Sequence, residues 1–201
     1  RRLLVSSMIR FHEADLIGVQ EAHRRQLDEM SFDMPEYTWF GLCRTDGTTS
    51  PNPDNEFSAI LYRKDRFEPL NGNTFWLSET PDIAGSKGWD AAFPRIVTWA
   101  KFRDKLTGKV FFHFNTHFDH LGEQARVESA KLLLKQVQEI SGDYPVVITG
   151  DFNTGESSVA YHILTDQNMP SHFTDAIRVS KIPHHGPRGT FSSNFQLPGV
   201  G

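Results

Sequence analysis

The sequence predicts a single α/β domain over residues 1–201, a four-layer α/β/β/α sandwich with two mainly antiparallel sheets packed face to face and helices outside. Three observations favour this fold class. Segments with strand-like patterns outnumber the helical ones. Residues 110–117 are apolar on both parities, which is typical of a strand that is covered on both faces. Residues 122–141 place their apolar side chains along one stripe, as expected of a helix that lies against a sheet.

The first half of the chain alternates short helical and strand patterns. Leu4, Met8 and Ile9 recur at helical spacing in the opening segment. Residues 15–21 form a short apolar run that predicts a buried strand, and residues 23–30 predict one or two polar helical turns. Three further strands are expected at residues 37–42, 56–63 and 67–77. A loop rich in turn residues, at 43–55, separates the first of them from the second.

The second half contains the clearest patterns. A long irregular connection spans residues 78–94, and loops of this length are often functional. The turn sequence KLTG then separates two apolar strands and predicts a hairpin. The remaining expected elements are the helix at 122–141, a strand at 146–152, a helix at 157–167 and a tail with Pro183, Pro187 and Pro198.

Composition and charge narrow the class of protein. The chain is 38% hydrophobic and 23% charged over 201 residues, which is typical of one soluble globular domain. Its net charge of −4 disfavours a protein that binds nucleic-acid duplexes by electrostatics alone. No apolar run approaches the length of a membrane span, and we expect a monomer. One cysteine, Cys43, excludes an internal disulfide, and the sequence leaves the compartment and a signal peptide undecided.

Polar side chains follow several apolar strands, where a turn would be expected. Asp151 and Asn153 end one strand on a shared face, and Asn115 and His117 end another in the same way. Glu21 follows the short strand near the N-terminus. Carboxylates near an imidazole and a carboxamide suit a hard divalent cation and a phosphate ester. Oxygen ligands favour Mg²⁺ or Mn²⁺, whereas zinc is disfavoured because the sequence has no HExxH motif and no cysteine cluster.

Each of these residues also has an ordinary structural interpretation. A lone glutamate at a strand end, such as Glu21 or Glu56, is usually a solvated cap. His117 alone would be read as a half-buried histidine, and the sequence DFN alone as an Asx turn. Arg95, which opens a strand after the loop at 78–94, is either structural or placed to reach a phosphate.

Four motifs in order along the chain resemble the endonuclease/exonuclease/phosphatase superfamily, which includes pancreatic-type deoxyribonuclease, abasic-site endonucleases and neutral sphingomyelinases. These motifs are ADLIGVQEA, NTHFDH, VVITGDFNT and RGTF. The most specific part is GDFN after an apolar strand, with THFDH upstream. The stretches FWLSETP and SKGWDAAFPRIVTWAKF are similar to a bacterial branch known only by the superfamily name. The resemblance runs nearly the whole length of the chain.

The resemblance implies a role for each polar strand end. Glu21 matches the glutamate that ligates the essential Mg²⁺, for which Mn²⁺ is an alternative. Asp151 matches the aspartate that orients or deprotonates the attacking water, and Asn153 the asparagine that positions the water and the phosphate. His117 matches the histidine that contacts the scissile phosphate.

The resemblance also implies a partner for this histidine. Glu56 stands where deoxyribonuclease-like members carry a glutamate paired to it, so we expect a hydrogen bond between Glu56 and His117 and a pKa of His117 above that of an isolated histidine. We further expect Asn115 and Arg95 to contact the phosphoester substrate.

The implied function is a divalent-metal-dependent hydrolase of phosphoester bonds, in the first place a phosphodiesterase. One alternative is a phosphomonoesterase that acts on a small phosphorylated molecule or a lipid head group. Another is a non-catalytic binding module of the same fold. DNA, RNA, lipid and small phosphoesters all remain open as substrates.

The chain departs from the superfamily pattern at both ends. The pattern begins with a strand that carries an asparagine, and it continues after GTF with an IDY-like strand and an SDH motif. None of these is in the sequence. A natural short form would expose two long sheet edges, so we expect that the first strand and the C-terminal strands are missing from this chain.

Overall fold

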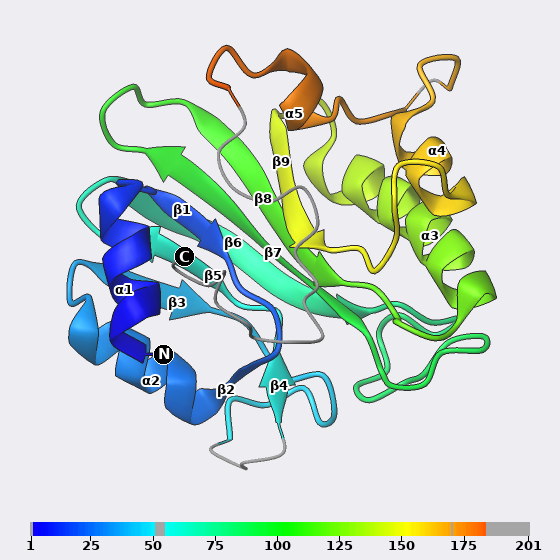
Figure 1. Ribbon diagram of the computed structural model, residues 1–201, viewed down its shortest axis with the longest axis horizontal. Helices are drawn as coiled ribbons and strands as arrows, with labels where there is room; N and C mark the ends of the chain where they lie inside the picture. The colour runs from blue at the N-terminus through cyan, green and yellow to red at the C-terminus, as the bar shows by residue number, and fades with distance from the viewer. Residues whose placement is uncertain (1, 51–54, 170, 184–201) are drawn as a thin grey trace, which may run out of the picture.

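The computed structural model describes residues 2–50, 55–169 and 171–183. Its two main sheets lie face to face, with helices on the two outer sides (Figure 1). This arrangement confirms the predicted α/β/β/α sandwich. The layers matter for function because the ends of strands from both sheets approach each other at one end of the sandwich.

The first sheet comes from the N-terminal part of the chain. Strand β5 is central, and β1 and β3 pair with it on either side, both antiparallel. Strands β2 and β4 form a separate two-stranded antiparallel ribbon. The elements are α1 (Arg2–Phe11), β1 (Leu16–Gly18), β2 (Ala22–His23), α2 (Arg24–Asp33), β3 (Tyr37–Phe40), β4 (Glu56–Phe57) and β5 (Ile60–Arg63).

The second sheet has the strand order β6-β7-β8-β9. The first three strands are antiparallel neighbours, which confirms the predicted hairpin, whereas β9 pairs with β8 in parallel. Parallel neighbours need a crossover connection, and helix α3 is part of it. The elements are β6 (Phe67–Trp76), β7 (Ile96–Asp104), β8 (Val110–His117), α3 (Glu123–Ser141), β9 (Val146–Asp151), α4 (Val159–Thr165) and α5 (Ala176–Val179).

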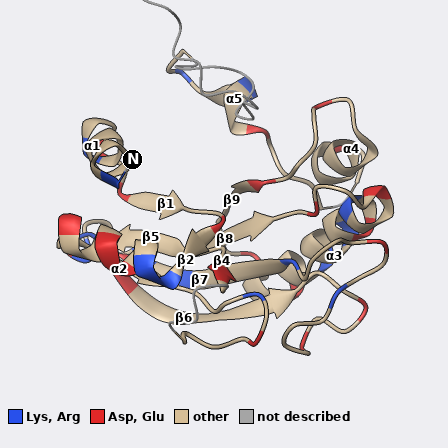
Figure 2. Cartoon of the chain, turned by 60° about the horizontal axis from the view of Figure 1, so that its bottom comes forward, with Lys and Arg blue, Asp and Glu red and all other residues tan. Residues whose placement is uncertain are grey.

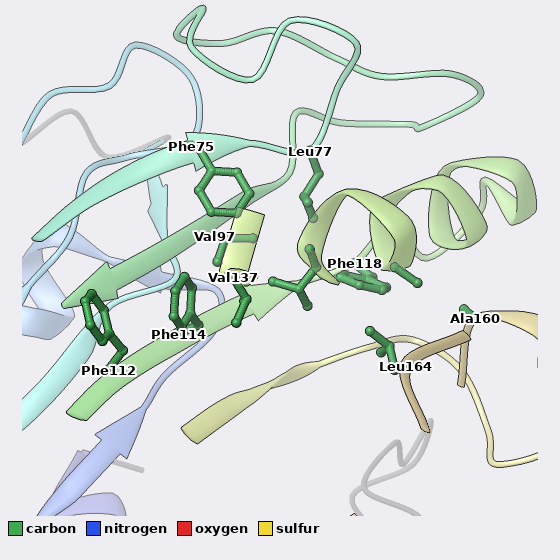
Figure 3. Close-up of a cluster of buried hydrophobic side chains, with 11 residues drawn as sticks. Phe75, Leu77, Val97, Phe112, Phe114, Phe118, Val137, Ala160 and Leu164 are labelled. Carbon is green, nitrogen blue, oxygen red and sulfur yellow. The ribbon is translucent and has the colours of Figure 1, made fainter. Parts of the chain in front are cut away.

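Three apolar clusters fill the spaces between the four layers. On β5, Leu61 packs in the cluster that contains residues of α1 and α2, whereas Ile60 packs between the two sheets. On β8, Phe112 and Phe114 pack in the cluster with α3 and α4 (Figure 3), and Phe111 packs between the sheets. Because β5 and β8 each have an apolar cluster on both faces, their sequences are apolar at both odd and even positions.

The strand expected over 56–63 is interrupted. Its first two residues pair with β2, whereas β5 begins at Ile60 and pairs with β1 and β3. At the break, the carbonyl oxygen of Ala59 accepts hydrogen bonds from Val19 N and Asn115 Nδ2, each at 3.0 Å. The other expected strands and helices differ from the observed elements only at their ends, whereas β2 and α5 were not expected. Pro187 and Pro198 lie outside the described residues.

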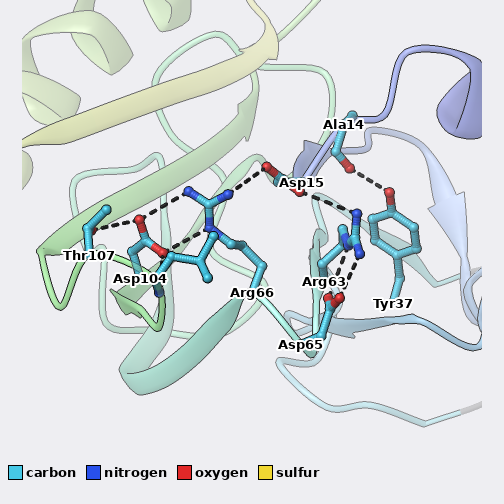
Figure 4. Close-up of polar contacts among 9 residues, drawn as sticks. Ala14, Asp15, Tyr37, Arg63, Asp65, Arg66, Asp104 and Thr107 are labelled. Carbon is cyan, nitrogen blue, oxygen red and sulfur yellow. Dashed lines mark hydrogen bonds and ion pairs between the residues drawn. The ribbon is translucent and has the colours of Figure 1, made fainter.

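A polar network joins the two sheets at the end of the sandwich opposite to His117. Figure 4 shows Arg66 between Asp104, which ends β7, and Asp15, which precedes β1. The Arg66 guanidinium bonds Asp104 at 2.8 and 3.1 Å and reaches Asp15 at 3.5 Å. The Arg66 ion pair and bonds from Thr107 and Leu106 hold the pKa of Asp104 well below its usual range, although desolvation opposes them.

Residues of both charge signs occur along α2 and α3 (Figure 2). On α2, Arg24 pairs with Asp28 and Arg25 with Glu29, one helical turn apart. Exposed pairs of this kind contribute little to stability. Within the described ranges, no helix combines the length and the apolar character that crossing a bilayer requires.

Candidate active site

The parallel pairing of β8 with β9 places two of the sequence-predicted residues side by side. His117 is the register partner of Asp151 at the last position of both strands. The Nε2 atom of His117 lies 4.0 Å from Asp151 Oδ2, and half of the Asp151 side chain is exposed. Asp151 Oδ1 accepts a hydrogen bond from Asn153 N at 2.9 Å, which is the Asx turn that DFN suggests.

The carboxamide of Asn153 determines the tautomer of His117. Its Nδ2 atom donates to the carbonyl oxygen of Phe118 at 2.9 Å, so the amide orientation is unambiguous. The same Nδ2 atom lies 2.9 Å from His117 Nε2. Because an amide nitrogen only donates, His117 Nε2 must accept, and the proton of the neutral ring is on Nδ1.

A small cleft, about 10 Å³ in volume, lies where the two sheets meet, and His117 is part of its lining. The first half of the chain contributes residues from the β1–β2 link, the loop after β3 and the start of β4, and the second sheet contributes the start of β7 and the end of β8. Its lining residues are Glu21, Arg44, Glu56, Phe57, Ser58, Arg95, Ile96 and His117. The structure therefore brings Glu21, Glu56, Arg95 and His117 together from segments far apart in the sequence.

The backbone of Glu21 is strained at the point where this residue lines the cleft. Its backbone has a φ of 57°, in the left-handed region that non-glycine residues rarely adopt, and Asn153 has a φ of 47°. Such strain persists only where the surrounding structure imposes it, and it clusters at functional sites. The Glu21 carboxylate makes no hydrogen bond or ion pair to any other described residue.

The donor set of the cleft fits a hard cation with few protein ligands. Mg²⁺ retains several waters and binds through one or two carboxylates, and the unpaired Glu21 carboxylate supplies one. Among the described residues, no group of three or more His, Cys, Asp or Glu side chains is arranged to hold a metal.

Arg95 is buried and held by its neighbours. Its Nε atom lies 3.2 Å from Asp119 Oδ2, and its Nη2 atom lies 3.0 Å from His120 Nδ1. Burial alone would raise the pKa of Asp119, but bonds from backbone N–H groups, including that of Gly122, and from Arg95 hold it well below its usual range. Asp119 is therefore an anion that orients Arg95 toward the cleft wall.

Asn115 does not contact the cleft, which corrects its expected role in substrate binding. Its side chain is fully buried, and Nδ2 donates to the carbonyl oxygens of Val19 and Ala59 at 2.9 and 3.0 Å. Its Oδ1 atom accepts from Gln20 and Thr149 at 2.7 and 2.9 Å. Both donors and both acceptor sites are used, so no group is left for a substrate. Asn115 instead ties β8 to the segment that leads to Glu21.

The expected bond between Glu56 and His117 is also corrected. Glu56 Oε2 pairs with Arg44 Nη1 at 2.7 Å, and the hydrogen bonds among described residues include none between Glu56 and His117. The pKa of His117 lies below the ordinary value of 6.5, at about 4, because of burial and then the positive charge of Arg95, which outweigh Asp151. A carboxylate pairs more strongly with a guanidinium cation than with this neutral imidazole.

Three residues of the site were not expected from the sequence. Arg44 lies in a loop rich in turn residues, and Asp119 and His120 follow a strand end, so none has a local pattern that marks it. For Asp119 and His120, the only signal was their place inside the THFDH motif. The motif RGTF lies outside the described residues.

Comparisons with known proteins give one consistent result. The sequence profile of the Endonuclease/Exonuclease/phosphatase family matches residues 1–198. A solved endonuclease/exonuclease/phosphatase from Bacteroides vulgatus is 46% identical with a TM-score of 0.79, and the match covers 83% of this chain and 62% of that one. A solved mannosyl-6-phosphatase from Bacteroides thetaiotaomicron is 40% identical with a TM-score of 0.78, covering 83% of this chain and 61% of that one.

A viral protein is similar over the same extent. An uncharacterised protein of Acanthamoeba polyphaga mimivirus is 28% identical over 178 residues, which are 84% of this chain and 63% of that protein. The chain thus spans about three fifths of the length of these relatives.

Proposed function

The chain belongs to the endonuclease/exonuclease/phosphatase family, and from that premise we propose that it hydrolyses phosphoester bonds with the help of a divalent cation, Mg²⁺ or Mn²⁺. The observation that carries the proposal is that His117 lies next to the Asp151 carboxylate and also lines the cleft. A half-exposed Asp151 carboxylate lies beside His117, and His117 also lines the cleft that contains Glu21 and Arg95. Water-activating and phosphate-binding groups are thus within reach of one another.

In the proposed reaction Asp151 orients a water and accepts its proton while the water oxygen bonds to phosphorus. The bond from phosphorus to the leaving oxygen breaks, and that oxygen takes up, through solvent, the proton that Asp151 accepted and leaves as an alcohol, so that one water is consumed. Asn153 donates both amide hydrogens of Nδ2 to Phe118 O and His117 Nε2, which leaves its Oδ1 atom to accept from the water and position it. His117 donates from Nδ1 to the phosphate.

Glu21 is the proposed ligand of the cation. A bound divalent cation would offset negative charge on the non-bridging oxygens of the phosphate. Arg95 contributes a second positive charge in the same cleft. Because Asp119 and His120 fix its guanidinium in advance, binding a phosphate would not require Arg95 to lose further conformational freedom.

Different observations favour diester and monoester substrates. The motif resemblance favours a phosphodiesterase, whereas the 40% identical relative from Bacteroides thetaiotaomicron is a mannosyl-6-phosphatase. That relative makes a phosphomonoesterase, acting on a small phosphorylated molecule, the second candidate. A panel of DNA, RNA, sphingomyelin, phosphoinositides and mannose 6-phosphate separates these candidates directly.

The test measures p-nitrophenol release from bis-p-nitrophenyl phosphate and p-nitrophenyl phosphate, with Mg²⁺, Mn²⁺ or EDTA. We expect turnover that EDTA abolishes. Glu21→Gln should shift the Mg²⁺ titration of activity to higher concentration and reduce the Mg²⁺-dependent increase in melting temperature. The same variant should change substrate affinity less than it changes the Mg²⁺ requirement. Glu68→Gln, which removes an exposed glutamate paired with Arg103, is the control. An unchanged Mg²⁺ titration for Glu21→Gln would refute the metal assignment, and no turnover of any substrate would indicate a binding module.

A further inference from the structure

Arg44 lines the same cleft as His117 and Arg95, yet the reaction described above gives it no role. It comes from the loop between β3 and β4, and only 14% of its side chain is exposed. Two contacts fix its guanidinium. Glu56 Oε2 lies 2.7 Å from Nη1, and the ring of Phe93 lies with its centroid 5.1 Å from Cζ.

The guanidinium of Arg44 keeps donors that no described residue uses. Arginine carries five N–H donors, and Glu56 is the only side chain within the described ranges that pairs with them. Arg95 differs, because Asp119 and His120, from the connection between β8 and α3, already hold its guanidinium. Burial lowers the pKa of Arg44, which indicates that its guanidinium is partly removed from water. Such a cation gains more from an anionic ligand than an exposed arginine does.

We propose that Arg44 is a second phosphate-binding residue of this cleft and that Glu56 is its positioning residue. The proposal rests on the proposed function, since it assumes that the cleft receives a phosphate group. A guanidinium presents parallel donors that match two phosphate oxygens. The contacts with Glu56 and Phe93 hold the guanidinium before the ligand arrives, which reduces the entropy lost on binding. Glu56 thus acts through Arg44 and not through His117.

The first experiment measures the binding of inorganic phosphate by calorimetry, with Mg²⁺ present. Arg44→Gln should weaken phosphate binding about 10- to 100-fold, as expected for the loss of hydrogen bonds from a charged donor. Arg44→Lys should recover part of the affinity, because it keeps the charge and loses the fork. The matched control pair is Arg103 and Glu68, which forms an ion pair at 2.8 Å on the second sheet, away from the cleft. Arg103→Gln and Glu68→Gln should leave phosphate binding unchanged.

The second experiment isolates the role of Glu56. Glu56→Gln should weaken phosphate binding in the wild-type background and have no further effect in Arg44→Gln, because a positioning residue has nothing left to position. In turnover assays both variants should raise KM more than they lower kcat. Adding guanidinium ion to Arg44→Ala should restore part of the phosphate affinity, which a merely structural arginine would not allow.

Unchanged phosphate affinity and KM in a folded Arg44→Gln would overturn the assignment of Arg44. If Arg44→Gln and Arg44→Ala do not fold, Arg44→Lys decides, since full wild-type affinity in that variant would exclude fork-shaped recognition. If the effect of Glu56→Gln persists in Arg44→Gln but disappears in His117→Gln, Glu56 acts through the histidine and its assignment fails. Arg44-dependent phosphate binding without hydrolysis of any ester would instead refute the proposed function and leave this inference standing.

Discussion

Asp151 combines an exposed carboxylate with a backbone held on both sides. Its main chain ends the parallel pairing with β8, and its Oδ1 atom accepts from Asn153 N. An asparagine at this position would keep an acceptor for that turn but could not take a proton from water. Replacing Asp151 with asparagine should therefore abolish proton transfer to this side chain with little change in structure.

We predict that Asp151→Asn lowers turnover about 100- to 10,000-fold, the usual contribution of a general base. The free energy of unfolding in urea should stay within about 0.5 kcal/mol of the wild type, because half of the side chain is exposed. Asp143→Asn, at an exposed position just before β9, is the control and should retain full activity. An Asp151→Asn enzyme with near-normal turnover would exclude the proposed mechanism.

Asn115, in contrast to Asp151, is a buried polar residue whose side-chain hydrogen bonds all go to other residues of the protein. Replacing it with alanine removes four hydrogen bonds and leaves polar groups of Val19, Gln20, Thr149 and the buried Ala59 with fewer partners. We predict that Asn115→Ala lowers the free energy of unfolding by about 3 kcal/mol or more. The Mg²⁺ requirement should rise as well, because Gln20 precedes Glu21.

Urea unfolding and a Mg²⁺ titration measure both effects. Asn73→Ala is the matched control, since Asn73 is exposed and bonds only the N–H of the next residue. Equal stability of the two variants would mean that the Asn115 network contributes little.

Among the elements, β1 depends most on a single residue for its position. A Cβ atom on Gly18 would lie 2.1 Å from Thr149 Oγ1 and 2.3 Å from Asn115 Oδ1. Only glycine lets β1 approach the second sheet closely enough for the Asn115 bonds to form. The position of Glu21, three residues later, is therefore set by the absence of a side chain at Gly18.

We predict that Gly18→Ala destabilises the protein by about 1–3 kcal/mol through overpacking and weakens Mg²⁺-dependent activity. Gly155→Ala provides a matched control, because a Cβ atom there meets nothing within 4 Å. Thermal unfolding of both variants measures the difference. If Gly18→Ala and Gly155→Ala melt at the same temperature, β1 does not approach the second sheet as closely as described.

On the scale of the whole molecule, the second sheet buries histidines as neutral residues. His113 is fully buried, its Nε2 atom lies 2.8 Å from Thr149 Oγ1, and its Nδ1 atom has no partner among the described residues. Burial lowers the pKa of His113 from 6.5 to about 4, and His117 is lowered to a similar value. Between these two pH values the unfolded chain binds more protons than the folded one. Stability must therefore fall as the pH falls.

We predict that the free energy of unfolding decreases as the pH is lowered from about 6.5 to 4, by as much as about 3 kcal/mol for His113 alone. The carboxyl groups of Asp104 and Asp119, whose pKa values are depressed, lose their contributions only below that range. Urea unfolding at several pH values should give a shallower dependence for His113→Phe than for the wild type. Parallel curves for the two proteins would contradict the assignment.

The sequence by itself determined the layers and most of the elements, although it did not predict β2, α5 or the break between β4 and β5. Apolar residues on both parities of 110–117 and the single stripe of 122–141 are consequences of backbone geometry, which repeats every two residues in a strand and every 3.6 in a helix. The same local geometry placed Asp151 and Asn153 at one strand end. These features need no knowledge of distant contacts. The family resemblance came separately from four sequence motifs, and the family profile agrees with it.

Only the tertiary structure decided which side chains meet. Glu56 pairs with Arg44 and not with His117, and Asn115 uses all its hydrogen-bonding groups before a substrate could reach it. Such choices depend on competition among charged and polar groups from both sheets, and no segment of sequence contains all the competitors. The physical reason is that periodicity is a property of the local backbone, whereas a hydrogen-bonding partner is set by distances across the fold.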